Sequence, residues 1–135
     1  MEEAGIIDFY ITNPDTLSTT NFKEVQELLV RDLIQGYKVK KLESITYKEI
    51  ISKYEISKIE VLSIDNEENI DFLPQAFKDS GIYPLIICAE TVTYDVSGNG
   101  TKKTKLINDI CSSGYISFAD TYINTIFVKE DIWKR

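Results

Sequence analysis

The stretch Lys58–Tyr94 constrains the fold most, because strand-like and helix-like segments alternate in it around a fixed glycine and proline. Ile59–Ile64 is β-branched and half apolar, which predicts a strand. Apolar residues at helical spacing predict a helix that begins near Leu73 and ends at Gly81, a residue suited to the left-handed position after a helix. Leu85–Ala89 is apolar at every position and therefore predicts a strand covered on both sides. This order predicts an α/β protein whose mixed sheet carries helices on both faces.

The remainder of the chain predicts more strands and helices of the same kinds. Gly5–Ile11 has the composition of a strand in the centre of the sheet. A helix is predicted from Phe22 to Ile34, because Asn21 and Glu24 form a capping pattern and apolar residues follow at helical spacing. The lysine-rich segment Tyr37–Leu42 is typical of a solvated edge strand. A short helix should follow Thr46.

A length of 135 residues predicts one domain, which we divide into a core, residues 1–114, and an extension, Tyr115–Arg135. The extension is too apolar for a disordered tail. Within it, Ile123–Val128 predicts an added strand and Tyr115–Phe118 a strand that pairs with it.

A resemblance to a known fold rests on Val61–Asp65, Ala76–Phe77, Gly81–Pro84 and Leu85–Ile87, followed by strand Glu90–Val96 and helix Lys102–Cys111. This order of elements resembles the second half of a thioredoxin-like fold, and within that superfamily it resembles the arsenical-operon metallochaperones. The resemblance covers the middle of the chain and implies a cis Tyr83–Pro84 bond at the start of a strand. Pro84 and Gly81 would then be structural residues.

The chain departs from that superfamily where its chemistry would lie. The reactive cysteines of the family follow the first strand, and the corresponding loop here, Thr12–Thr20, has neither Cys nor His. Redox and arsenite chemistry therefore cannot be assigned to any residue. What the resemblance implies is a non-catalytic module.

The charge balance limits the classes of partner. Fifteen Lys and Arg stand against 22 Asp and Glu, which gives a net charge of −7. Nucleic acid and anionic membrane surfaces are disfavoured, because both require basic protein surface. The charge favours a basic protein as partner, although solubility alone would also explain it. The chain opens without a leader-like segment and has no apolar run of about 20 residues, so we expect a cytoplasmic protein without membrane contact.

Few residues offer catalytic or metal-binding chemistry. The chain contains no histidine, which excludes Ser–His and Cys–His systems and imidazole ligation. Cys88 and Cys111 lie in apolar segments, and we expect both to be reduced, buried and unbridged. We therefore predict no enzyme activity, no cofactor and no metal site, although a pair of carboxylates meeting in space remains open.

Two segments could bind ligands. Gly98–Thr104 precedes a helix predicted to be capped by Thr101, so it could hold an anion or could be a flexible turn. A second segment carries an acidic run, Asp65, Glu67, Glu68 and Asp71. It lacks the glycine and terminal glutamate of a calcium loop, which leaves a solvated turn or a patch that receives a basic partner. With these four residues we group Tyr122, since exposed tyrosines are frequent at interfaces.

Three functional hypotheses follow. The first is a non-catalytic, thioredoxin-like module that binds another protein, with an exposed edge strand that would allow a homodimer. The alternative is a small acidic immunity or inhibitor protein that neutralises a basic, nuclease-type toxin. An enzyme that uses either cysteine or a carboxylate pair ranks last.

Overall fold

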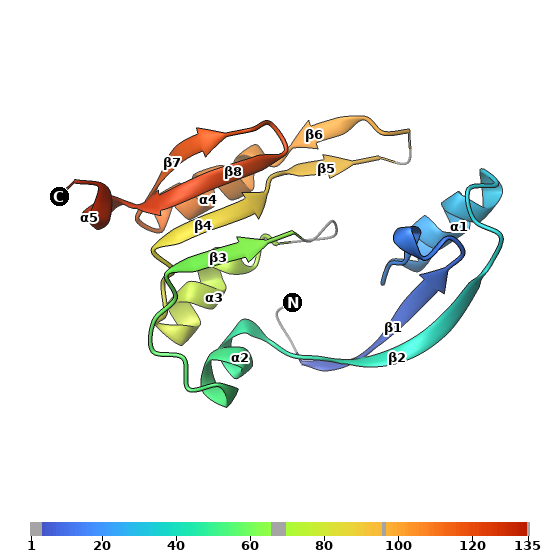
Figure 1. Cartoon of the computed structure of the whole chain (residues 1–135), viewed down its shortest axis with the longest axis horizontal. Helices are drawn as coiled ribbons and strands as arrows, with labels where there is room; N and C mark the ends of the chain where they lie inside the picture. The colour runs from blue at the N-terminus through green and yellow to red at the C-terminus, as the bar shows by residue number, and fades with distance from the viewer. Residues whose placement is uncertain (1–3, 66–69, 96, 135) are drawn as a thin grey trace.

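Two separate hydrophobic clusters organise the fold of a computed structural model that describes residues 4–65, 70–95 and 97–134. The first lies in an N-terminal arm, residues 4–44, and the second lies under a four-stranded sheet (Figure 1). The elements in chain order are β1 (Gly5–Thr12), the 3₁₀ helix η1 (Asp15–Leu17), α1 (Phe22–Val30), β2 (Tyr37–Ser44), α2 (Tyr47–Lys53), β3 (Val61–Ile64), α3 (Leu73–Ser80), β4 (Ile86–Glu90), β5 (Val92–Tyr94), β6 (Gly100–Lys102), α4 (Thr104–Ser112), β7 (Tyr115–Asp120), β8 (Asn124–Lys129) and α5 (Glu130–Trp133).

The N-terminal arm is an antiparallel hairpin of β1 and β2 with α1 packed at one end. The Asn21 side chain accepts hydrogen bonds from the first turn of α1, as the capping pattern predicts. Val25, Leu28 and Ile34 form its small core. The helix ends at Val30, earlier than predicted, because Asp32 adopts the left-handed conformation at φ 59°. β1 pairs only with β2 apart from one bridge to Thr19, so the prediction of a central strand is wrong.

The larger sheet has the strand order β3–β4–β8–β7. β3 and β4 run parallel, while β8 runs antiparallel to both of its neighbours. The predicted α/β class with a mixed sheet is confirmed. A short hairpin of β5 and β6 extends from the end of β4. None of the helices in the described ranges has the length and apolarity needed to cross a bilayer.

The core of this sheet lies on one face. Ile87 and Phe127 point from the two inner strands toward Phe77 of α3 and Leu106 of α4, and all four are almost fully buried. Figure 1 shows α3 and α4 together behind the sheet. The arrangement differs from the expectation of helices on both faces.

The C-terminal segment is an integral part of the sheet. The two predicted strands exist as β7 and β8, but β8 lies between β4 and β7. Residues 115–135 therefore do not form an extension packed on a finished core. Their buried members, Tyr115 and Phe127, belong to the main hydrophobic cluster.

The structure confirms the prediction for one of the two residues expected to be structural and corrects the prediction for the other. Gly81 ends α3 in the left-handed conformation at φ 71°, as predicted. Pro84 is fully buried just before β4, but the prediction of a cis Tyr83–Pro84 bond is wrong. Among the described residues the cis peptide bond is Asn13–Pro14. An X–Pro bond prefers trans by only about 0.5–1 kcal/mol, so local sequence does not decide the isomer.

Candidate protein-binding surface

The face of the four-stranded sheet opposite α3 and α4 is apolar across all four strands. Partners in adjacent strands project to the same face, so the register defines rows of neighbouring side chains. The residues of this face, called the open face below, form two rows: Val61, Ile86, Val128 and Ile116 in one, and Ser63, Cys88, Ile126 and Ala119 in the other.

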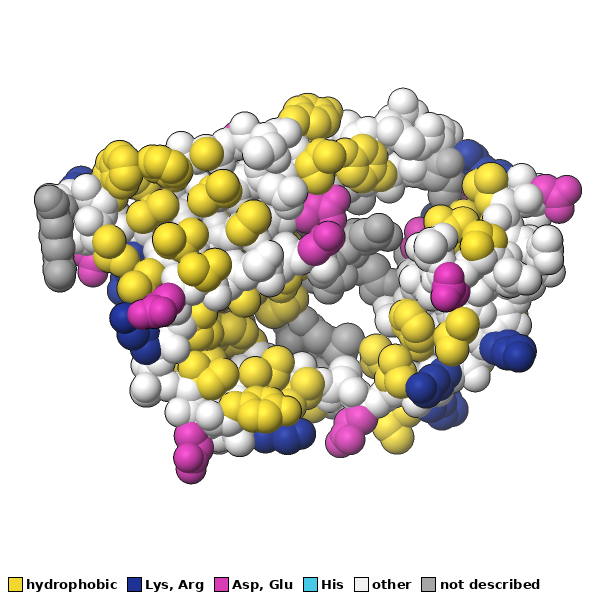
Figure 2. Space-filling model, viewed as in Figure 1, with side chains coloured by type: hydrophobic (Ala, Val, Ile, Leu, Met, Phe, Trp, Pro, Cys, Tyr) yellow, Lys and Arg dark blue, Asp and Glu magenta, His cyan; other side chains and the backbone are white. Residues whose placement is uncertain are grey.

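No helix of the described residues covers these rows. Val61 is 61% exposed and Ile86 is 37% exposed, while Cys88, Ile126 and Val128 are half-buried among their neighbours. Figure 2 shows hydrophobic side chains gathered over β3, β4, β8 and β7, in the view that places α3 and α4 behind the sheet. A contiguous exposed apolar patch of this kind usually marks an interaction site.

An aromatic pair lies at the β7 edge of the same sheet. The rings of Phe118, in β7, and Trp133, in α5, are 4.8 Å apart in an edge-to-face arrangement. Their exposed fractions are 51% and 56%. Large rings of this kind supply much of the binding energy at protein interfaces.

A polar network fixes the backbone of Tyr122 in the turn between β7 and β8. It adopts φ 75°, and its backbone N–H donates to the Asp120 carboxylate at 2.6 Å. Lys102 donates to the same carboxylate and to the Tyr122 carbonyl. The Lys102 hydrogen bond, with those from Thr125 and the Tyr122 backbone, holds the pKa of Asp120 below its usual range. Tyr122 is 59% exposed and is thus presented in a fixed position.

Of the predicted acidic residues, Asp65 and Asp71 lie at the same end of the sheet as Tyr122. Asp65 follows β3 and is exposed, and Asp71 lies just before α3. Glu90 pairs with Asn124, which brings the carboxyl end of β4 beside the Tyr122 turn. Asp65 nonetheless follows the edge strand β3, whereas Tyr122 lies in the turn between β7 and β8, and β4 separates β3 from that hairpin. Glu67 and Glu68 are outside the described residues.

The predicted anion-binding loop is not one loop. Gly100–Lys102 forms β6, and α4 begins at Thr104 with Lys103, not Thr101, as its N-cap. Lys102 is engaged by Asp120, at 2.7 Å in the closest ion-pair contact. One of the two lysines on which the prediction depended is therefore already paired.

The two thiols are free, as predicted, but neither is buried. Cys88 and Cys111 are both partly exposed, because Cys88 lies on the open face and Cys111 lies on α4 at the margin of the core. Among the described residues, no three His, Cys, Asp or Glu side chains gather into a group that could hold a metal ion.

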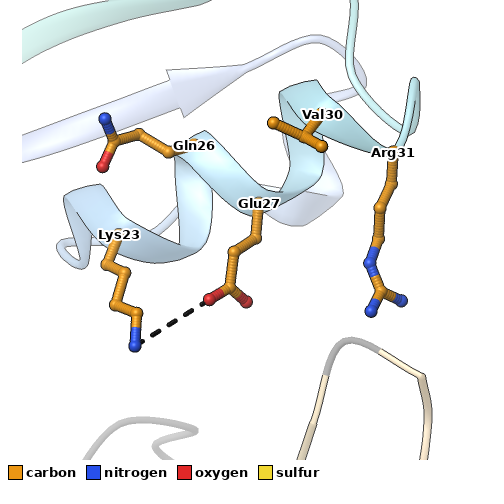
Figure 3. A pocket seen from close by; sticks show the side chains of 5 residues that line it. All are labelled: Lys23, Gln26, Glu27, Val30 and Arg31. Carbon is orange, nitrogen blue, oxygen red and sulfur yellow. Dashed lines mark ion pairs between the residues drawn. The ribbon is translucent and has the colours of Figure 1, made fainter.

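The hollow drawn in Figure 3 lies on the surface of α1 and not on the open face. It has a volume of about 260 Å³ and is lined by Lys23, Gln26, Glu27, Val30 and Arg31. Lys23 and Glu27 form an ion pair at 4.0 Å. The Arg31 guanidinium extends away from the helix and donates to Ser97 Oγ at 3.4 Å. Arg31 thereby joins the N-terminal arm to the loop between β5 and β6.

A second hollow, of about 380 Å³, lies between α2 and α3. Tyr47 and Phe72 supply its aromatic wall, and Lys48 and Asp79 supply its charges. Burial raises the pKa of Tyr47 to about 12. The Tyr47 hydroxyl donates to the Ile82 carbonyl at 3.4 Å, so it packs α2 against the segment after α3.

No protein-family model, curated protein or solved structure matches this chain. The chain also lacks the cis Tyr83–Pro84 bond that the resemblance to thioredoxin-like proteins implied. The open face was not predicted as a site, although its signal was present in the sequence. Leu85–Ala89 is apolar on both faces, and we interpreted that pattern as cover by the chain's own helices.

Proposed function

We propose that this chain is a non-catalytic protein-binding module that receives its partner on the open face of the four-stranded sheet. The observation that carries the proposal is the pair of apolar rows that crosses all four strands without a covering helix. Burial of such a face yields about 25 cal/mol per Å² of apolar surface. Phe118 and Trp133 would add aromatic contacts at the β7 edge.

The chemistry of the partner follows from charge. The chain carries a net charge of −7, and Asp65 lies exposed at the carboxyl end of β3. We expect an apolar partner surface with basic residues at one end, opposite Asp65 and the Tyr122 turn. Association should slow as salt rises, because salt screens exposed charges beyond about 10 Å at 0.1 M. A small basic toxin, the alternative predicted from size and charge, is one partner of this chemistry.

The composition supports a binding role over a catalytic one. The chain has no histidine, and its sequence contains no recognisable nucleophile–base motif. The open face itself presents aliphatic side chains, one serine and one thiol. Such a surface is suited to exclusion of water from a protein contact and not to proton transfer.

The test compares two identical substitutions at exposed valines. Val61→Glu places a charge on the open face, whereas Val30→Glu places the same charge on α1, where the side chain is 87% exposed. The wild-type chain serves as bait in its source cells, and the captured partner is then identified and purified. We expect V61E to weaken binding of the purified partner by about tenfold or more and V30E to leave it unchanged.

Both substitutions are at exposed positions, so both variants should keep wild-type stability to within about 0.5 kcal/mol. Equal affinity of V61E and the wild-type chain would contradict the proposed surface. Loss of binding in V30E alone would move the site to α1.

A further inference from the structure

β2 exposes an unpaired strand edge along the N-terminal arm, on a different part of the molecule from the open face. Tyr10 exchanges backbone hydrogen bonds with Thr19 on the side of β1 away from β2. Tyr10 and its partner Val39 therefore form a non-hydrogen-bonded pair in the hairpin, and the Val39 N–H and C=O point to the outer edge of β2.

The same alternation applies along the rest of β2. Tyr37, Lys41 and Glu43 also direct their backbone groups outward, because residues two apart in a strand are equivalent. Within the described part of the chain, these groups accept and donate no backbone hydrogen bond outside the hairpin. Figure 1 shows β2 on the outer side of the arm.

Lysines predominate along this edge, which also carries Glu43 near its end. Lys38 and Lys40 are exposed on one face of β2, and in the described ranges neither forms an ion pair. Lys41 differs, since it pairs with Asp8 across the hairpin at 2.8 Å. Val39 and Tyr37, on the other face, are 54% and 39% exposed.

A second copy of the chain does not suit this edge. Antiparallel self-pairing must place outward-directed residues opposite each other. Four registers then pair at least five residues of β2, and the one centred on Leu42, which pairs residues 40–44, sets Lys41 opposite Glu43. Centring on Val39 sets Lys38 opposite Lys40, centring on Lys40 sets Lys40 opposite itself, and centring on Lys41 sets Lys41 opposite itself. Like charges directly opposite are destabilising, so the lysines act against the registers centred on Val39, Lys40 and Lys41. The register centred on Leu42 pairs neither Lys38 nor Val39 within the strand.

The geometry points to an extended acidic segment of another protein as the occupant of this edge, bound by addition of a strand to β2. Its backbone would pair with the outward groups of Val39 and its equivalents. Acidic side chains would lie opposite Lys38 and Lys40, and apolar side chains would lie opposite Tyr37 and Val39. The recognised pattern is therefore an alternation of acidic and apolar residues.

The test uses a short, end-capped peptide that alternates Asp and Val, fluorescently labelled and titrated with the full chain. A peptide that alternates Lys and Val is the control ligand. We expect the acidic peptide to bind and the basic peptide to bind at least about tenfold more weakly, since two cross-strand pairs change from attractive to repulsive.

Two variants separate strand addition from simple charge attraction. Val39→Pro removes an N–H that points outward and leaves the β1 ladder intact, so it should abolish peptide binding while the arm stays folded. Lys38→Glu with Lys40→Glu should reverse the preference toward the basic peptide. The matched control is Lys48→Glu with Lys78→Glu, which makes the same change in net charge on α2 and α3.

The following results would refute the inference. If the acidic peptide fails to bind, or binds V39P as well as the wild-type chain, strand addition at β2 is refuted. If the wild-type chain sediments as a dimer that V39P abolishes, the occupant is a second copy.

Discussion

Tyr115 links the start of β7 to Pro84, two residues before β4. Its hydroxyl donates to the Pro84 carbonyl at 2.7 Å, and both residues are buried. A buried carbonyl that loses its donor retains the full cost of leaving water. This one hydrogen bond therefore fixes the entry of the inner strand β4 against the outer strand β7.

Removal of that hydroxyl should destabilise the chain. Tyr115→Phe leaves the Pro84 carbonyl without its donor, and we expect a loss of about 1–2 kcal/mol in the free energy of unfolding by urea denaturation. Tyr94→Phe is the control, because the Tyr94 ring is 46% exposed. Equal stabilities of the two variants would show that the Tyr115 hydroxyl contributes nothing.

The buried tyrosines also predict an alkaline transition. Burial raises the pKa of Tyr47 from 10 to about 12 and raises that of Tyr115 further. Above pH 10 the unfolded chain loses these protons and the folded chain keeps them, so the unfolded state binds fewer protons and stability falls with rising pH. We expect the decline to begin near pH 10 and to continue through pH 12. It should be shallower in Tyr47→Phe, and an identical slope in that variant would refute the assignment.

At the scale of elements, the β7–β8 hairpin shows what the sequence can and cannot specify. The apolar pattern of residues 115–128 predicts both strands, and the structure contains both. The pattern does not indicate that β8 enters between β4 and β7, because periodicity reports how a strand is buried and not which strands it pairs with. The same limit explains why β1, equally apolar, was placed in the wrong sheet.

A substitution in β8 tests its position inside the sheet. Phe127 is fully buried in the core, so Phe127→Ala should cost about 3–5 kcal/mol in the free energy of unfolding. Phe118→Ala in the outer strand β7 removes a ring that is 51% exposed and should cost about 1 kcal/mol or less. Comparable losses would mean that β8 is not a core strand.

The open face was the part of the fold least accessible from sequence, for a physical reason. Ile86 and Cys88 alternate with Ile87 and Ala89, so β4 is apolar on both faces. One face meets α3 and α4, and the other meets no helix in the part of the chain that the structure describes. An apolar face is stabilised equally by the chain's own helix or by another molecule, and the residues that form it are the same in either case.

At the scale of the whole molecule, the arm and the sheet have separate cores and offer different surfaces. The sheet presents an apolar open face near carboxylates, whereas the arm presents a basic strand edge. The described contacts between the two parts include the hydrogen bond from Arg31 to Ser97. Two surfaces of opposite character on one small chain suit a protein that holds partners, and the open face is central to that account.

Thiol labelling of Cys88 in the presence of the captured and purified partner tests the central claim most directly. Cys88 lies within the open face, and Cys111, on α4 behind the sheet, is an internal control in the same molecule. We predict that bound partner slows modification of Cys88 and leaves the rate at Cys111 unchanged, as measured by mass spectrometry of the two peptides. An unchanged rate at Cys88 in the saturated complex would contradict binding at the open face.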